Sequence, residues 1–129
     1  MRLVQLLGCC LVLALFSADS IVTIFDGEYM WNEDGRTGAI TATFTAAEDG
    51  TWDVSFDFDY AGGEHTYKGI AWGSLTEGKL RGEVAADDGP NRYVFEGSVA
   101  DGVYEGTHSI VVGAESKESG TLKLERRSD

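Results

Sequence analysis

The chain has 129 residues, the size of a single domain, and a formal net charge of −12 at pH 7. A chain this acidic repels phosphate backbones and anionic lipid surfaces, so we expect no binding to nucleic acid. Its two cysteines, Cys9 and Cys10, lie close to the N-terminus. The rest of the chain therefore offers no thiol for a disulfide, a metal site or a nucleophile.

The first twenty residues have the layout of a secretory signal peptide. Arg2 supplies a positive charge, residues 3–16 are apolar apart from Gln5, and small residues suited to cleavage follow within 17–20. The apolar run is shorter than the ~20 residues that a membrane-spanning helix needs. We therefore expect residues 1–20 to be a cleaved signal peptide and residues 21–129 to form one secreted or periplasmic domain without a membrane span.

Two other interpretations of this segment stay open. The stretch Leu6-Leu7-Gly8-Cys9 resembles a bacterial lipoprotein box, which would place a lipid on Cys9, but the apolar run continues to Phe16 where a polar tether is expected. An uncleaved anchor is the second alternative. Small secreted domains of animals usually carry disulfides, so the lack of later thiols favours a bacterial envelope or secreted protein.

After the signal, apolar and polar residues alternate with a period of two, which is typical of β-strands with one buried face. No segment keeps a period of 3.6 residues, so we expect no long helix. All aromatic side chains except Phe16, Phe25 and Trp72 are predicted to face inward. About eight strands are expected, with these inward-facing positions in chain order: Tyr29 and Trp31; Ile40 to Phe44; Trp52 to Tyr60; Tyr67 to Leu75; Leu80 to Val84; Tyr93 to Val99; Tyr104 to Ile110; Leu122 and Leu124.

Asp-Gly pairs punctuate the chain at positions 26–27, 34–35, 49–50, 88–89 and 101–102. This dipeptide suits tight hairpin turns, because both residues tolerate the positive φ angles that a type I′ turn requires. Strands joined by such short turns are antiparallel neighbours, so the predicted fold is all-β, an antiparallel up-and-down meander.

Glycines on the predicted inner face favour closure of this meander into a small barrel of about eight strands, which also removes exposed sheet edges. Each follows a large residue by two positions, as in Tyr67-Lys68-Gly69 and Phe95-Glu96-Gly97. A neighbouring aromatic ring can cover the bare backbone at such a site. The interior of an eight-stranded barrel is either filled by side chains or holds one small ligand, and both alternatives stay open.

The stretch from Gly27 to Asn32, GEYMWN, followed by Gly35, resembles the first strand of calycins, the lipocalin-like and avidin-like barrels. Lipocalins carry Gly-x-Trp there, whereas this chain has Tyr29 at the third position. The resemblance covers the meander layout over most of the mature chain. Avidin-like chains also place tryptophans of later strands over biotin, but the later strands here have only the outward Trp72, so we expect no biotin and carry over no ligand-binding residue. The chain also looks like small uncharacterised secreted barrel proteins of bacteria, which implies no function.

Inward polar groups suggest a first function, binding of a small apolar ligand inside the barrel. The predicted binding residues are Tyr67, Tyr93, Tyr104 and His108, which combine apolar surface with hydrogen-bonding groups. The other histidine, His65, is expected at a barrel rim. For both histidines the simpler interpretation is that the ring makes its hydrogen bonds within the protein and has no role in binding.

Outward apolar residues suggest the alternative function, protein–protein interaction or a structural role in the cell envelope. Ile70, Trp72 and Val94 are predicted to lie on three adjacent strands and to form one exposed patch. Scattered surface residues, or cover from residues 21–25, would equally explain them. The oligomeric state is left open.

We predict that the protein is not an enzyme and has no cofactor, because the sequence contains no nucleophile elbow, zinc-protease motif, phosphate loop or dinucleotide fingerprint. No metal site is expected either. Asp53, Asp57 and Asp59 point outward along one strand, and such a row does not converge on an ion as calcium ligands must.

Overall fold

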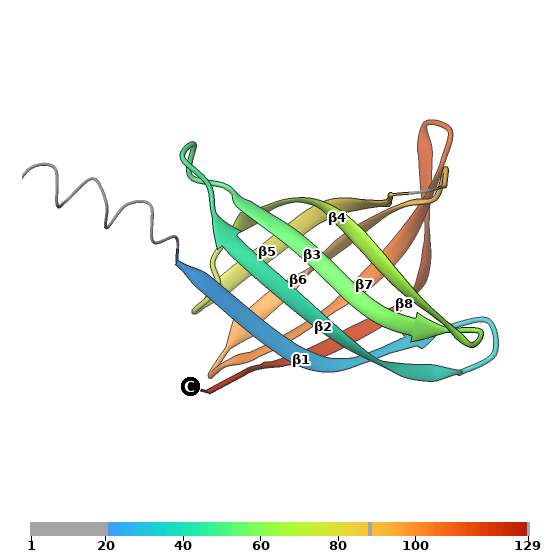
Figure 1. Ribbon diagram of the computed structural model, residues 1–129, viewed down its shortest axis with the longest axis horizontal. Helices are drawn as coiled ribbons and strands as arrows, with labels where there is room; N and C mark the ends of the chain where they lie inside the picture. Colours follow the sequence, from blue (N-terminus) through green and yellow to red (C-terminus); the bar gives the residue numbers. More distant parts are fainter. Residues whose placement is uncertain (1–20, 88, 129) are drawn as a thin grey trace, which may run out of the picture.

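The computed structural model describes residues 21–87 and 89–128, which form a closed barrel of eight antiparallel strands in meander order (Figure 1). The predicted all-β meander and its closure are confirmed. The predicted signal peptide, with Cys9, lies outside the described residues. Within them, no helix is long and apolar enough to cross a membrane. The strands are β1 (Val22–Trp31), β2 (Thr37–Ala46), β3 (Trp52–Tyr60), β4 (Gly63–Gly73), β5 (Gly78–Ala86), β6 (Arg92–Ala100), β7 (Val103–Val112) and β8 (Glu115–Arg126).

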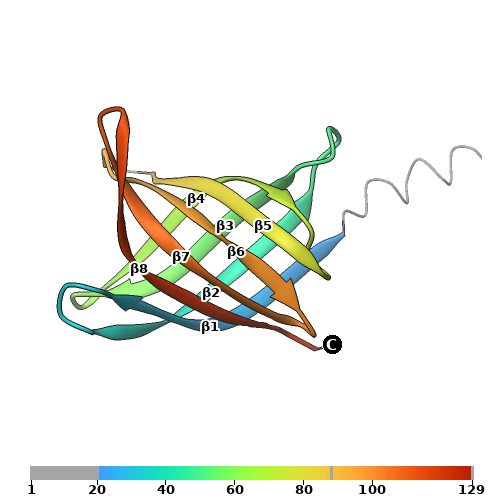
Figure 2. The same cartoon turned by 180° about the vertical axis from the view of Figure 1, so that it is seen from behind.

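The two ends of the barrel differ in what they carry. One end, which we call the closed end, holds the start of β1, the end of β8 and the β2–β3, β4–β5 and β6–β7 turns (Figure 1). The opposite end, which we call the mouth, holds the β1–β2, β3–β4 and β5–β6 connections and the β7–β8 hairpin, seen from behind in Figure 2. The ladder between β1 and β8, from Phe25↔Arg126 to Trp31↔Gly120, closes the barrel.

Side chains fill the closed end. Leu75, in the turn after β4, is only 5% exposed and fills the interior at this end. The Ser74 hydroxyl holds this turn, since it accepts hydrogen bonds from the backbone N–H groups of Thr76 (3.1 Å) and Glu77 (2.9 Å). Burial of each large apolar side chain contributes roughly 1.5–3 kcal/mol before chain entropy is counted. The most deeply buried are Phe25, Phe44, Leu80, Val99, Tyr104 and Leu124.

Inner-face glycines allow the strands to curve this tightly. A Cβ at Gly69 would collide with the backbone carbonyl of Glu83 on the neighbouring strand, so only glycine fits. Aromatic rings cover other glycines, as predicted: the ring of Phe95 lies against Gly82. Glycine is thus required by the closeness of the backbones and not only by turn geometry.

Two predictions about the N-terminal strand are wrong. Phe25 faces inward and is fully buried, because β1 begins at Val22 and keeps one alternation through Gly27 to Tyr29. The pair Asp26-Gly27 is therefore not a turn. Gly27 lies where β1 approaches the backbone of β8, and the Asp26 carboxylate accepts hydrogen bonds from Arg127 (2.7 and 2.8 Å) on the outer face. This guanidinium holds the pKa of Asp26 below its usual value.

The other Asp-Gly pairs lie in connections between strands. Asp101-Gly102 forms the two-residue β6–β7 turn with φ angles of 51° and 79°, as a type I′ turn requires. Gly35 and Gly50 also adopt positive φ. Asp88 lies outside the described residues, while Gly89 lies in the β5–β6 loop. The β3–β4 turn uses Ala61-Gly62 with the same backbone signs, which the sequence pattern did not single out.

We expect Gly69→Ala to lower the free energy of unfolding by about 2 kcal/mol or more, because the added methyl group collides with backbone that cannot move away. Gly63→Ala, on the same strand, is the matched control: its Cβ would meet only the His65 ring at 4.0 Å. The control should change stability by less than about 0.5 kcal/mol. Urea unfolding of both variants tests this, and equal effects would contradict it.

Candidate functional site

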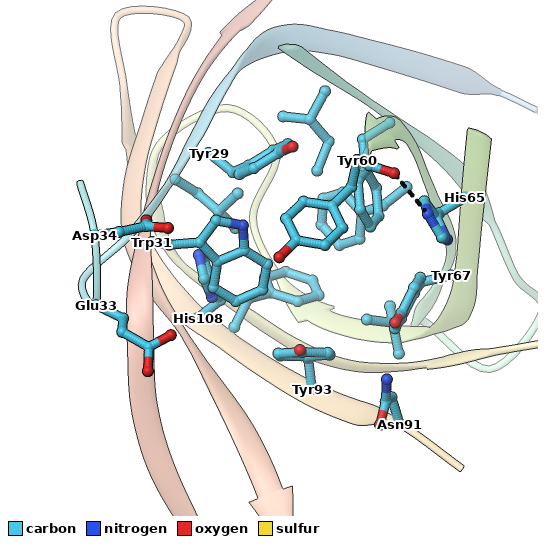
Figure 3. Close-up of a pocket in the computed structure, with 16 residues that line it drawn as sticks. Tyr29, Trp31, Glu33, Asp34, Tyr60, His65, Tyr67, Asn91, Tyr93 and His108 are labelled. Carbon is cyan, nitrogen blue, oxygen red and sulfur yellow. Dashed lines mark hydrogen bonds between the residues drawn. The ribbon is translucent and has the colours of Figure 1, made fainter. Parts of the chain in front are cut away.

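A cavity of about 440 Å³ opens at the mouth of the barrel (Figure 3). Its floor is formed by apolar side chains in the middle of the barrel, which separate it from the filled closed end. The interior is therefore neither wholly filled nor wholly hollow: one half is packed and the other holds space. The floor residues are Ile40, Phe56, Val84, Phe95 and Leu122.

Five aromatic rings form a closed circuit around this cavity, and we call them the collar; in order around the circuit they are Trp31, Tyr29, Phe58, Tyr67 and Tyr93. Each ring contacts the next, with centroid distances of 6.0, 5.5, 5.5, 5.6 and 6.1 Å around the circuit. Most contacts are edge-to-face, the arrangement that the aromatic quadrupole favours. Rings that support one another in this way hold the cavity walls in place.

The collar arises from strand alternation near the mouth. Its members occupy inward positions on β1, β3, β4 and β6, at the ends of these strands that border the mouth. The Tyr29 hydroxyl donates a hydrogen bond to the Asp59 backbone carbonyl (2.7 Å) and so ties β1 to β3. Burial raises the pKa of both Tyr29 and Tyr93, which keeps these phenols protonated.

Tyr60 and His65 stand at the rim. The Tyr60 ring is 38% exposed, lies 5.8 Å from the Trp31 ring and falls within the outline of the collar in Figure 3. His65 donates a hydrogen bond to the Tyr60 backbone carbonyl (3.1 Å) and stacks on Phe58 at 5.6 Å. His65 therefore lies at the rim, as predicted, and these two contacts fix the orientation of its ring.

His108 forms part of the wall beside Trp31, with 5.0 Å between the ring centroids. A bulge in β8 makes Ser119 an extra residue opposite His108 and brings its hydroxyl within 2.6 Å of Nδ1. The other nitrogen, Nε2, donates to the Met30 backbone carbonyl (3.1 Å). Both ring nitrogens therefore have protein partners, and burial lowers the pKa of His108.

The cavity offers polar groups, but no Lys or Arg side chain is among its described lining residues. The tyrosines Tyr60, Tyr67 and Tyr93 line it and carry hydroxyl groups that can donate or accept hydrogen bonds. Glu33 and Asp34, in the loop after β1, border the cavity, and none of the described lining residues is Lys or Arg. The site can therefore receive apolar surface and offer hydrogen bonds and negative charge, but it offers no cation to an anionic group.

Of the four predicted binding residues, Tyr67, Tyr93 and His108 line this cavity and Tyr104 does not. Tyr104 lies two residues after the β6–β7 turn, so it belongs to the closed end, where it is 1% exposed and packs on Phe95. Its hydroxyl is buried without a partner among the described residues, and burial raises its pKa.

Several cavity residues were not singled out from the sequence as binding residues. Trp31, Phe58 and Tyr60 were predicted to face inward, but the alternation pattern does not say which end of the barrel is open. The Trp31 indole N–H is buried without a hydrogen-bond partner among the described residues, on the side of the ring that faces Tyr29 and Tyr60 in Figure 3. Asp34 is predicted to lie in a turn as part of an Asp-Gly pair, and the sequence pattern does not single out Glu33.

The predicted outer patch is interrupted by charge. Ile70 is 43% exposed and Val94 is half-buried, but Glu83 lies between them in the register of β4, β5 and β6. The guanidinium of Arg81 lies 4.8 Å above the Trp72 ring. Residues 21–25 do not cover this face, because they lead into and form the first half of β1 on the far side of β2 and β3.

Within residues 21–87 and 89–128, no three His, Cys, Asp or Glu side chains lie close enough together to hold a metal ion. No protein-family model matches the sequence, and no curated protein is found to be similar to it.

The burial of His108 predicts a dependence of stability on pH. The unfolded side chain titrates near 6.5, and the folded pKa lies below that value, so the unfolded chain binds more protons between the two. The free energy of unfolding should therefore decline as the pH falls below about 6.5 and level off under the folded pKa. His108→Gln should lack this decline. Urea unfolding at a series of pH values measures the difference, and identical pH profiles would contradict it.

Proposed function

We propose that this protein is a non-catalytic binder of a small, mainly apolar ligand, which enters the mouth and lies within the collar. The observation that carries the proposal is the open cavity of about 440 Å³ surrounded by five mutually supporting aromatic rings. Small-molecule sites are typically concave, largely apolar spaces of roughly 300–1,000 Å³ that carry a few polar groups.

The packing of the site favours binding without rearrangement. Side chains that already contact one another lose little conformational freedom when a ligand arrives, so less of the interaction energy is spent on ordering them. The apolar floor at Phe56, Val84 and Leu122 would contact the buried part of the ligand. The hydroxyl groups of Tyr60, Tyr67 and Tyr93 would orient its polar part.

The wider setting is part of the same proposal. We propose that the barrel is lipocalin-like, that residues 1–20 direct it to the periplasm or the exterior, and that it carries its ligand there. The barrel topology and the resemblance of the Gly27–Asn32 segment to the calycin first strand support this proposal.

Binding can be tested with the neutral fluorescent probe N-phenyl-naphthylamine. We expect saturable binding of one probe per chain with an increase in probe fluorescence. Val84→Phe, which adds a ring to the cavity floor, should reduce the affinity at least about tenfold because it fills the space that the probe needs. Leu122→Phe is a second variant that fills the cavity, and it should reduce the affinity in the same way.

Val94→Phe is the matched control, since it adds the same ring to the outer face of the neighbouring strand. It should leave the affinity unchanged. Circular dichroism and urea unfolding identify any variant that fails to fold. The proposal is wrong if the wild-type protein does not bind the probe, or if both filled-cavity variants fold and bind it as the wild type does.

A second candidate function, binding of a protein partner through Ile70, Trp72 and Val94, rests on the exposure of Ile70. Trp72→Ser should then abolish association with the partner, or self-association, and leave folding intact. Sedimentation analysis of the wild type and of the Trp72→Ser variant would measure self-association. Retention of partners from the native source by each protein would measure association with a partner. Unchanged association would exclude the outer face.

A further inference from the structure

We infer that the ligand is an organic cation, an ammonium group carried on an apolar body, and that the ammonium group lies within or just above the collar. This inference rests on the proposed function, because it names the chemical class of ligand for the same cavity. Three features carry it: the geometry of the rings, the charges at the mouth, and the absence of positive charge among the described lining residues.

The collar brings several rings within reach of one point. Neighbouring centroids are 5.5 to 6.1 Å apart, and a flat regular pentagon with such sides has a radius of about 5 Å, within the ~6 Å over which a ring face attracts a cation. Puckering of the circuit makes this radius smaller. A single ammonium group near the centre therefore lies close to all five rings, and to Tyr60 as well.

The indole and phenol rings suit this role. Trp attracts cations most strongly among the aromatic side chains, and Trp31 is joined in the collar by three Tyr rings and one Phe ring. Burial raises the pKa of Tyr29 and Tyr93, which favours their neutral phenols, so these residues attract a cation through the ring quadrupole and through hydroxyl oxygens that can accept a hydrogen bond. Removal of the ammonium group from water strengthens both contributions.

The charge of the mouth points the same way. Glu33 and Asp34 border the cavity directly after Trp31 in the chain. The guanidinium of Arg36 lies 3.7 Å from Asp34 and partly neutralises it. Among the described residues no ion pair involves Glu33, which adds a further carboxylate to the loop. With a net charge of −12 on the whole chain, the field steers cations toward the protein and repels anions.

Among the described residues, no Lys or Arg side chain lines the cavity. The wall beside Trp31 is His108, and its burial favours the neutral ring. Lys68, Arg92 and Lys123 form ion pairs with Asp87, Glu83 and Glu105, and none of the three lines the cavity. A carboxylate or sulfonate ligand would find no partner of opposite charge here, and an aliphatic neutral ligand would leave the acidic rim without a role.

Three probes of nearly equal shape test the inference by displacement of N-phenyl-naphthylamine. They are the naphthylmethyl-trimethylammonium ion, its neutral isostere with carbon in place of nitrogen, and naphthylmethanesulfonate. We expect the cation to bind at least about fivefold more tightly than the neutral isostere, as cation–π attraction at a desolvated site allows, and the anion to bind most weakly. Raising the salt concentration from about 0.02 M to about 0.5 M should weaken binding of the cation only.

Two variants locate the effect. Glu33→Gln should reduce the affinity for the cation about two- to fivefold and leave that for the neutral isostere unchanged. The matched control is Glu77→Gln, the same charge change at the closed end. Trp31→Leu should reduce the affinity for the cation more than the affinity for the neutral isostere.

The outcomes separate this inference from the proposed function. If cation and isostere bind equally well, or the anion binds best, the ligand is not a cation, but the cavity still binds apolar molecules and the proposed function stands. If none of the three displaces the fluorescent probe and the probe itself does not bind, both fail. Loss of cation preference in Glu77→Gln as large as in Glu33→Gln would also overturn the inference, because it would assign the effect to net charge alone.

Discussion

The narrowness of an eight-stranded barrel is the constraint on which the rest of this structure depends. When eight strands close, the inner faces come so near one another that a full row of side chains does not fit. The chain meets this constraint with glycine where backbones approach most closely, as at Gly69 against Glu83, and with a ring over the bare backbone, as at Gly82 under Phe95. The β1–β8 ladder depends on glycine in the same way, because a Cβ at Gly27 would collide with the backbone carbonyl of Lys123 and one at Gly120 with that of Met30.

The same constraint explains why the two ends differ. At the closed end, a turn folds an apolar side chain inward: Leu75 fills the space between the strands, and the Ser74 hydroxyl fixes the turn that carries it. The described loops at the mouth bring polar groups such as Glu33 and Asn91 to the cavity instead. In the half of the interior next to the mouth, the space between the strands is therefore occupied only by side chains of the strands. Rings at neighbouring inward positions meet edge to face and leave the middle open, and the collar with its cavity is the result.

Sequence alternation predicts the fold well because inside and outside are decided locally, residue by residue. It fails where the role of a residue is determined by contact with a strand that is far away in the sequence. Asp26-Gly27 has the composition of a turn, yet its glycine serves the approach of β8, about a hundred residues later in the chain, and Asp26 binds Arg127. Tyr93 and Tyr104 are both inward tyrosines by alternation, but one borders the mouth and the other is packed at the closed end. Which end stays open depends on the β4–β5 turn: alternation predicts that Leu75 faces inward, but it does not show that Leu75 lies in a turn and fills one end of the barrel.

Placement of charge, more than its amount, decides what the cavity can select. The outer aspartates of β3 face solvent, where Asp57 accepts a hydrogen bond from Thr66 (2.7 Å) and its charge is screened within about 10 Å. Glu33 is also exposed, but it borders the cavity and therefore lies closer to a bound ligand than the outer aspartates do, so its charge acts more strongly there. A net charge of −12 is compatible with solubility alone. The combination of an acidic rim, a collar of indole and phenol rings and a wall histidine held neutral by burial favours positive charge at one particular point of the molecule.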